Sequence, residues 1–246
     1  MIGMLELLIA AAGFVAGAIA SVTGFGIGSV LTPVLSPELG TRLAVAAVSI
    51  PHLIATSIRF WMLRRHVDVP VLINFGILSA AGGLAGALLH SAAANPLLTL
   101  IFALLLLFAG IAGLSGYAAK MRFGPKTAWI AGALSGLLGG LVGNQGGIRS
   151  AALQAFGLQR QAFVASATAM ALIVDVARMP VYFAKFWADM LPAAGLIFLA
   201  TIGAVVGTFS GAGLLHRIPE RLFHRAVSGV ILGLGCFMLT RALQGG

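Results

Sequence analysis

The chain has 246 residues, of which 60% are hydrophobic and only 9% are charged, and its mean hydropathy is +1.06. These values exclude an ordinary soluble domain, in which about 25% of residues are charged, and they indicate a polytopic membrane protein. The net charge of +9 does not indicate a nucleic-acid-binding protein. Most of the basic residues lie in loops between apolar segments, where they are typical of the positive-inside pattern.

In chain order, the hydropathy pattern predicts an all-α protein with about eight hydrophobic segments. Most of them approach the roughly 20 residues that a helix needs to cross a bilayer. The predicted segments are residues 4–35, 43–61, 69–90, 96–116, 127–154, 163–186, 191–215 and 223–243. A basic connecting loop at 117–126 separates a first repeat, 1–116, from a second repeat, 127–246, and each repeat has four segments.

The first segment of each repeat is interrupted by glycines, which disfavour a continuous helix. Without a gap, residues 16–29 align with residues 135–148. The alignment pairs Gly17 with Gly136, Gly24 with Gly143, and Gly28 with Gly147. Two interrupted segments at matching positions of a duplicated membrane protein point to a transporter's binding site.

The charges of the loops favour one orientation of the two repeats. If all eight segments crossed the bilayer, the basic loops would lie on both faces, which is a poor positive-inside pattern. If the two broken segments are re-entrant hairpins, most basic loop residues share one face. We therefore predict six crossings, two re-entrant hairpins, inverted repeats and an external N-terminus.

The two broken stretches supply most of the predicted substrate-binding residues. From the first stretch they are Thr23, Gly24, Phe25, Gly26, Gly28 and Ser29, and from the second Gly143, Asn144, Gln145, Gly146, Gly147, Arg149 and Ser150. Arg149 stands where a helix is expected to begin again, and the free N–H groups of a helix N-terminus attract anions. The alternative is that Asn144, Gln145 and Arg149 only satisfy the broken backbone. The hydroxyls of Thr23 and Ser29 also have two alternatives: they donate to the substrate, or they bond to the backbone of their own helix.

Ionisable residues inside the apolar segments complete the candidate site, since such groups usually face a cavity or a partner. Asp175 and Arg178 are three residues apart on one helical face, and Arg59 aligns with Arg178. We predict Arg59 and Arg178 as counter-charges for an anion, and Asp175 or His52 as a proton carrier. The alternatives are an ion pair that reaches the interface, an interfacial anchor for Arg59, and a hydrogen-bonded interior histidine for His52.

Other kinds of chemistry have weak signals. No histidine or cysteine spacing fits a metal site, and no cofactor motif is present, since no strand precedes the glycines and no acidic ribose ligand follows them. Residues 113–116 have the Gly-x-Ser-Gly form of an intramembrane serine protease, but the later segments offer no histidine base at depth. Glycine pairs spaced by four residues predict close helix contacts; they are Gly13 and Gly17, Gly82 and Gly86, Gly132 and Gly136, and Gly203 and Gly207.

Residues 24–35 and 135–147 resemble the two glycine-rich signatures of the TauE/SafE sulfite exporter family. The resemblance implies a permease of the bacterial inner membrane that moves small sulfur-containing anions, such as sulfite or an organosulfonate, usually outward. The chain departs from the family pattern at Asn144, Gln145 and Arg149, and Ala152 stands where the first copy has Pro33. We expect export by alternating access. The expected partners are a small anionic substrate and the lipid bilayer, and no nucleic acid. The sequence leaves open whether the protein forms a homo-oligomer. The alternatives are a membrane scaffold without transport and the serine protease.

Overall fold

The computed structural model describes residues 3–93, 95–116, 125–143, 146, 149, 153, 156, 158–214 and 220–244. The elements given for this part of the chain are all helical. They are α1 (Met4–Thr23), α2 (Ile27–Leu63), η1 (Arg64–His66), α3 (Val69–Ala92), α4 (Asn95–Leu114), α6 (Pro125–Val142), α8 (Arg160–Met190), η2 (Leu191–Ala193), α9 (Ala194–Leu214) and α10 (Glu220–Leu243).

The lengths and hydropathies of these helices fit a multi-pass membrane protein. Among the described residues, five stretches are long and apolar enough to cross a membrane, namely Met4–Thr23, Ile27–His66, Val69–Ala92, Asn95–Leu114 and Gln161–Ala212. Large apolar side chains also lie exposed on the outside of the helices, including Leu7, Ile77 and Phe198. An apolar exterior suits lipid as the surrounding solvent. The number of eight segments stays a prediction.

Two predicted helix breaks are confirmed, and one predicted boundary is wrong. α1 ends at Thr23 and α6 ends at Val142, and each is followed by a glycine with positive φ, Gly24 and Gly143. The expected loop between residues 35 and 43 is instead a kink within α2, where only Gly40 leaves helical geometry, with φ 73° and ψ 151°. The kink is stabilised from α4, because the Arg42 backbone N–H donates to Asn95 Oδ1 at 2.8 Å.

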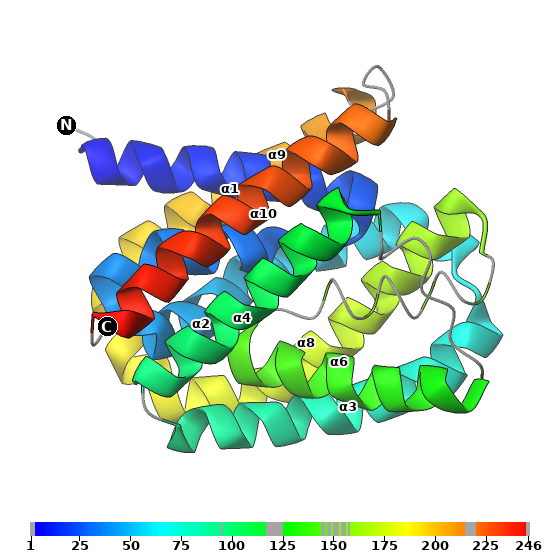
Figure 1. The fold of residues 1–246 in the computed structure, drawn as a ribbon, viewed down its shortest axis with the longest axis horizontal. Coiled ribbons are helices and arrows are strands. Elements are labelled where there is room, and N and C mark those ends of the chain that lie inside the picture. The colour runs from blue at the N-terminus through cyan, green and yellow to red at the C-terminus, as the bar shows by residue number, and fades with distance from the viewer. Residues whose placement is uncertain are drawn as a thin grey trace.

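Glycines bring the outer helices together in pairs, as their spacing predicted. α1 packs on α9, and α3 packs on α6 (Figure 1). A side chain at Gly13 or Gly17 would overlap the backbone of Ala200 or Ala204 in α9. The same close approach occurs between α3 and α6, where Gly82, Gly86, Gly132 and Gly136 lie against backbone of the facing helix. Small residues let helix backbones approach closely where lipid provides no hydrophobic driving force.

The two longest helices occupy the middle of the molecule. α2 and α8 pack against each other between the α1 and α9 pair on one side and the α3 and α6 pair on the other, while α4 packs on α10 (Figure 1). α2 and α8 carry buried charged and polar side chains, among them His52, Arg59, Asp175 and Arg178. The fold therefore surrounds a central polar cluster with apolar helices.

Candidate functional site

The first glycine-broken stretch forms a tight turn between α1 and α2. Gly24 has φ 78° and Gly26 has φ 130°, which are conformations that side chains other than glycine rarely adopt. The Thr23 hydroxyl donates to the Ile19 carbonyl oxygen at 3.0 Å, and the Phe25 N–H donates to Thr23 Oγ1 at 3.2 Å. Thr23 therefore holds the turn together, which is the backbone role that the sequence left open as an alternative.

The second glycine-broken stretch meets the first. Gly28 lies against the carbonyl oxygen of Gly143, and Gly146 lies against the ring of Phe25. Neither Gly28 nor Gly146 has room for a side chain at these contacts. The two interrupted segments, more than 100 residues apart in the sequence, thus come together as their matching positions in the two repeats suggested.

A small cavity lies where the two turns meet, with room for about one water molecule. Its lining residues are Gly24, Phe25, Gly26, Gly28, Ser29, His52, Gly143, Gly146 and Arg149. All of these belong to the site predicted from the sequence. Asn144, Gln145, Gly147 and Ser150, which were also predicted, lie outside the described residues.

Arg149 presents an unused hydrogen-bonding edge within this site. Its side chain is buried, with 2% of the residue exposed, and its Nη1 donates to the Ala167 carbonyl oxygen of α8 at 2.8 Å. Nε and Nη2 are also buried and find no hydrogen-bond partner among the described residues. These two nitrogens form the side edge of the guanidinium group, which matches two oxygens of a carboxylate or a similar oxyanion.

Arg178 differs from Arg149 because its donors are engaged. Its Nε and Nη2 lie 3.0 and 2.7 Å from Asp175 Oδ1, and its Nη1 donates to the Gly139 carbonyl oxygen at 2.6 Å. The predicted ion pair is present, but it is fully buried and does not reach an interface. Since Gly139 lies near the C-terminal end of α6, Arg178 ties that end to α8 just before the break at Gly143.

His52 connects this ion pair to the cavity. It lines the cavity from α2, and its Nδ1 lies 2.6 Å from Asp175 Oδ2. Asp175 therefore accepts from Arg178 on one oxygen and from His52 on the other. His52 is both a cavity residue and a hydrogen-bonded interior histidine, the two alternatives that the sequence left open.

Arg59 is buried beside the same cluster, with 2% of the residue exposed. Its Nε donates to Thr168 Oγ1 at 2.9 Å, and its Nη1 is buried with no hydrogen-bond partner among the described residues. Arg59 is therefore not an interfacial anchor, although neighbouring Trp61 is exposed. It is not among the residues that line the cavity.

Three residues of the cluster were missed in the sequence. Thr168 accepts from Arg59, and the Tyr182 hydroxyl donates to the Gly140 carbonyl oxygen. His90, fully buried, has Nδ1 2.7 Å from the Leu141 carbonyl oxygen and Nε2 2.9 Å from the Arg42 carbonyl oxygen. The one available signal was a histidine within a predicted apolar segment. Because His90 is the last residue of that segment, its burial was not predicted.

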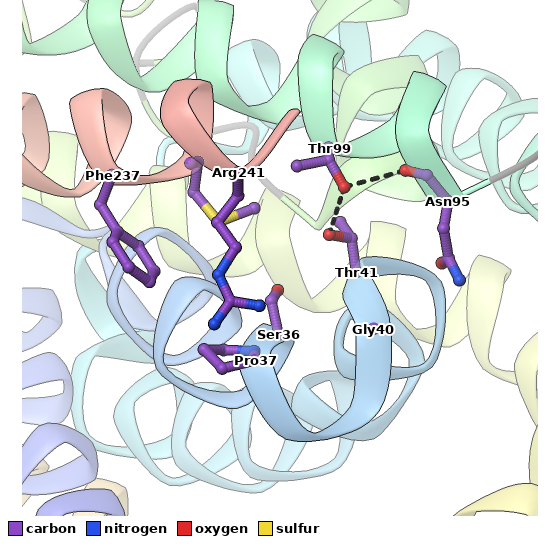
Figure 2. Close-up of a pocket in the computed structure, with 9 residues that line it drawn as sticks. Ser36, Pro37, Gly40, Thr41, Asn95, Thr99, Phe237 and Arg241 are labelled. Carbon is purple, nitrogen blue, oxygen red and sulfur yellow. Dashed lines mark hydrogen bonds between the residues drawn. The ribbon is translucent and has the colours of Figure 1, made fainter. Parts of the chain in front are cut away.

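A second cavity lies at the kink of α2 (Figure 2). It is lined by Ser36, Pro37, Gly40, Thr41, Asn95, Thr99, Phe237, Met238 and Arg241. The hydroxyls of Thr41 and Thr99 lie 2.6 Å apart, and Thr99 donates to the Asn95 carbonyl oxygen at 2.9 Å. These contacts join α4 to the kink, so the cavity marks the place where the two parts of α2 change direction.

The chemistry that the central site offers is anion binding. Groups of three or more metal-ligating side chains are absent from the described residues. Within the same residues the site combines buried guanidinium donors, an imidazole and glycine-rich backbone. Arginine is the side chain best suited to binding planar or branched oxyanions.

Comparison with known proteins gave one match. The family model described as "Sulfite exporter TauE/SafE" matches residues 9–238, which is nearly the whole chain. No curated protein and no solved structure matched.

Proposed function

The chain belongs to the TauE/SafE sulfite exporter family, and on this premise we propose that it exports sulfite or an organosulfonate across the inner membrane by alternating access. The family is one of membrane transporters for sulfur-containing anions. The transported anion binds in the cavity between the two glycine-broken turns.

The observation that carries this proposal is the free edge of Arg149. A buried donor without a partner costs free energy, of the order of 1–3 kcal/mol and more when the group is charged. Arg149 lines the cavity and has two donors without a partner among the described residues. An oxyanion of the transported class supplies the missing acceptors, so the cost disappears when the substrate binds.

The pairing of the helices supports a two-fold relation between residues 1–116 and 127–246, and the loop charges favour an inverted arrangement of these two halves. In the alignment of the halves, α1 corresponds to α6 and α3 corresponds to α9. Exchanging the halves converts the observed pair α1 and α9 into the observed pair α6 and α3. A two-fold relation of this kind allows one half to move against the other around a fixed site.

The small size of the cavity agrees with an occluded conformation in this mechanism. With room for about one water molecule, it admits sulfite only after the two turns separate. Positive-φ glycines lie where such a movement needs flexible backbone, at Gly24, Gly26, Gly40 and Gly143.

We assign proton coupling to His52 and Asp175. Their hydrogen bond of 2.6 Å joins the cavity to the buried ion pair with Arg178. A proton gained or lost by this pair changes the charge beside the bound anion, which is what coupling between anion and proton movement requires.

Efflux of labelled sulfite from proteoliposomes tests this function. Vesicles with the wild-type protein should release sulfite faster than protein-free vesicles, and Arg149→Gln should remove most of the difference. A membrane scaffold predicts no flux above that of protein-free vesicles, and this outcome would contradict transport. Ser115→Ala should leave the flux unchanged, whereas a serine protease would lose its activity with that substitution.

A further inference from the structure

The buried cluster carries more positive than negative charge. Arg59, Arg149 and Arg178 are each at most 2% exposed, and Asp175 is the one buried acid among the acidic side chains that the structure describes. Three guanidinium groups against one carboxylate leave two unbalanced positive charges, even when His52 is neutral. Burying an unpaired charge is strongly unfavourable, so this excess among the described residues calls for negative charge from a bound ligand.

Asp175 is already committed within the cluster. Its Oδ1 accepts from Arg178 and its Oδ2 from His52. The two guanidinium groups left without a carboxylate are those of Arg59 and Arg149, and the same two retain buried nitrogens without a partner among the described residues. The charge excess and the free donors therefore point to the same pair of arginines.

These two arginines converge on one point of α8. Arg149 donates to the carbonyl oxygen of Ala167, and Arg59 donates to the hydroxyl of Thr168, the next residue. The turn at Gly24 packs against the same place, because a Cβ at Gly24 would lie 3.1 Å from the Cβ of Ala167. Both arginines are thus held on α8 beside the first turn, whose glycines line the cavity.

We infer that the site binds a single oxyanion with two negative charges, and that it discriminates against anions with one. The inference rests on the proposed function and narrows it to dianions, such as fully deprotonated sulfite or a sulfonate with a second acidic group. Arg149 binds two oxygens through Nε and Nη2, and Arg59 supplies the second positive charge. The cavity is too small for two such ions, and it admits one when the two turns separate.

Equilibrium binding to the purified full chain, measured by calorimetry, tests this inference. Sulfate and methanesulfonate form a matched pair, since both are tetrahedral and they differ by one charge. We expect sulfate to bind about 10- to 100-fold more tightly, the factor that a hydrogen bond to a charged group contributes. Sulfite should bind more tightly as the pH rises and bisulfite loses its proton, while sulfate binding follows no such increase.

Arg59→Gln provides the decisive comparison, because it removes one positive charge and leaves the edge of Arg149 intact. The ratio of sulfate to methanesulfonate affinity should fall towards one in Arg59→Gln and stay unchanged in Arg65→Gln, at an exposed arginine outside the site. Thermal unfolding of each variant shows whether it is folded. Equal affinities in the wild type would overturn the requirement for two charges and leave transport intact. A folded protein that binds none of these anions would overturn the proposed function as well.

Discussion

Gly28 lies directly against the carbonyl oxygen of Gly143, so the two glycine-broken turns meet with no space for a side chain between them. This contact brings the start of α2 against the end of α6 beside the cavity. It also makes the fit between the two halves of the chain sensitive to a single methyl group.

Gly28→Ala should therefore separate the two turns. Overpacking of this kind costs about 1–3 kcal/mol, and the methyl group here would meet backbone, which cannot rotate away. Thermal unfolding in detergent should show a lower Tm and weaker sulfite binding. Gly195→Ala is the matched control, because nothing lies within 4 Å of an added Cβ at Gly195 in α9. Equal Tm values for the two variants would contradict the close contact.

Asp175→Asn should destabilise the protein strongly. Removing one partner of a buried ion pair costs about 3–5 kcal/mol, because the other charge stays buried without compensation. Arg178 would then keep the Gly139 carbonyl oxygen as an acceptor but lose the carboxylate that balances its charge. The double variant Asp175→Asn/Arg178→Gln should regain part of the lost stability in thermal unfolding. If the two substitutions were simply additive, the ion pair would not be the source of the effect.

His52→Gln separates binding from proton coupling. Glutamine keeps a hydrogen-bond donor for Asp175 but does not titrate. Sulfite affinity should change by less than about threefold, which corresponds to less than the net worth of a typical hydrogen bond. Stimulation of sulfite efflux by an imposed pH gradient should be lost. A variant that responds to the gradient as the wild type does would exclude His52 as the proton carrier.

Gly40→Ala tests the kink of α2 as a moving part (Figure 2). A residue with a side chain at φ 73° is strained by about 1–3 kcal/mol, and an added Cβ would lie 3.2 Å from Asn95 Nδ2. Gly116→Ala is the control, since its φ of 69° gives the same strain while nothing lies within 4 Å. Both variants should lose stability, but only Gly40→Ala should slow sulfite efflux. Equal efflux rates in the two variants would contradict a role of the kink in transport.

The sequence predicted the outline of the site because glycine and charge leave strong local signals in an apolar chain. The breaks at Gly24 and Gly143, and the ion pair of Asp175 and Arg178, follow from residue type and spacing alone. What could not be predicted are contacts between distant segments, such as that of His52 with Asp175, 123 residues apart. The kink at Gly40 was also missed as such, because its stabilisation comes from Asn95 on another helix.

The different contacts of the arginines likewise became apparent only in the structure. Arg59 and Arg178 align in the two halves, and both were predicted as counter-charges for an anion. Arg178 is engaged by Asp175. Arg59, with Thr56 three residues before it, has no acid at the matching position, and its Nη1 finds no partner in the part of the chain that the structure describes. The two aligned positions therefore make different contacts: Arg178 joins α8 to the Gly139 carbonyl oxygen of α6, and Arg59 donates to Thr168.

The most direct test of the account is sulfite binding to Arg149→Gln, measured by calorimetry beside Arg65→Gln, which changes an exposed arginine. We expect Arg149→Gln to weaken binding by about 100-fold or more, since two hydrogen bonds to a charged group are lost, and Arg65→Gln to bind as the wild type does. Arg149→Gln protein that is folded and binds sulfite with wild-type affinity would contradict the assignment of the free guanidinium edge as the anion site.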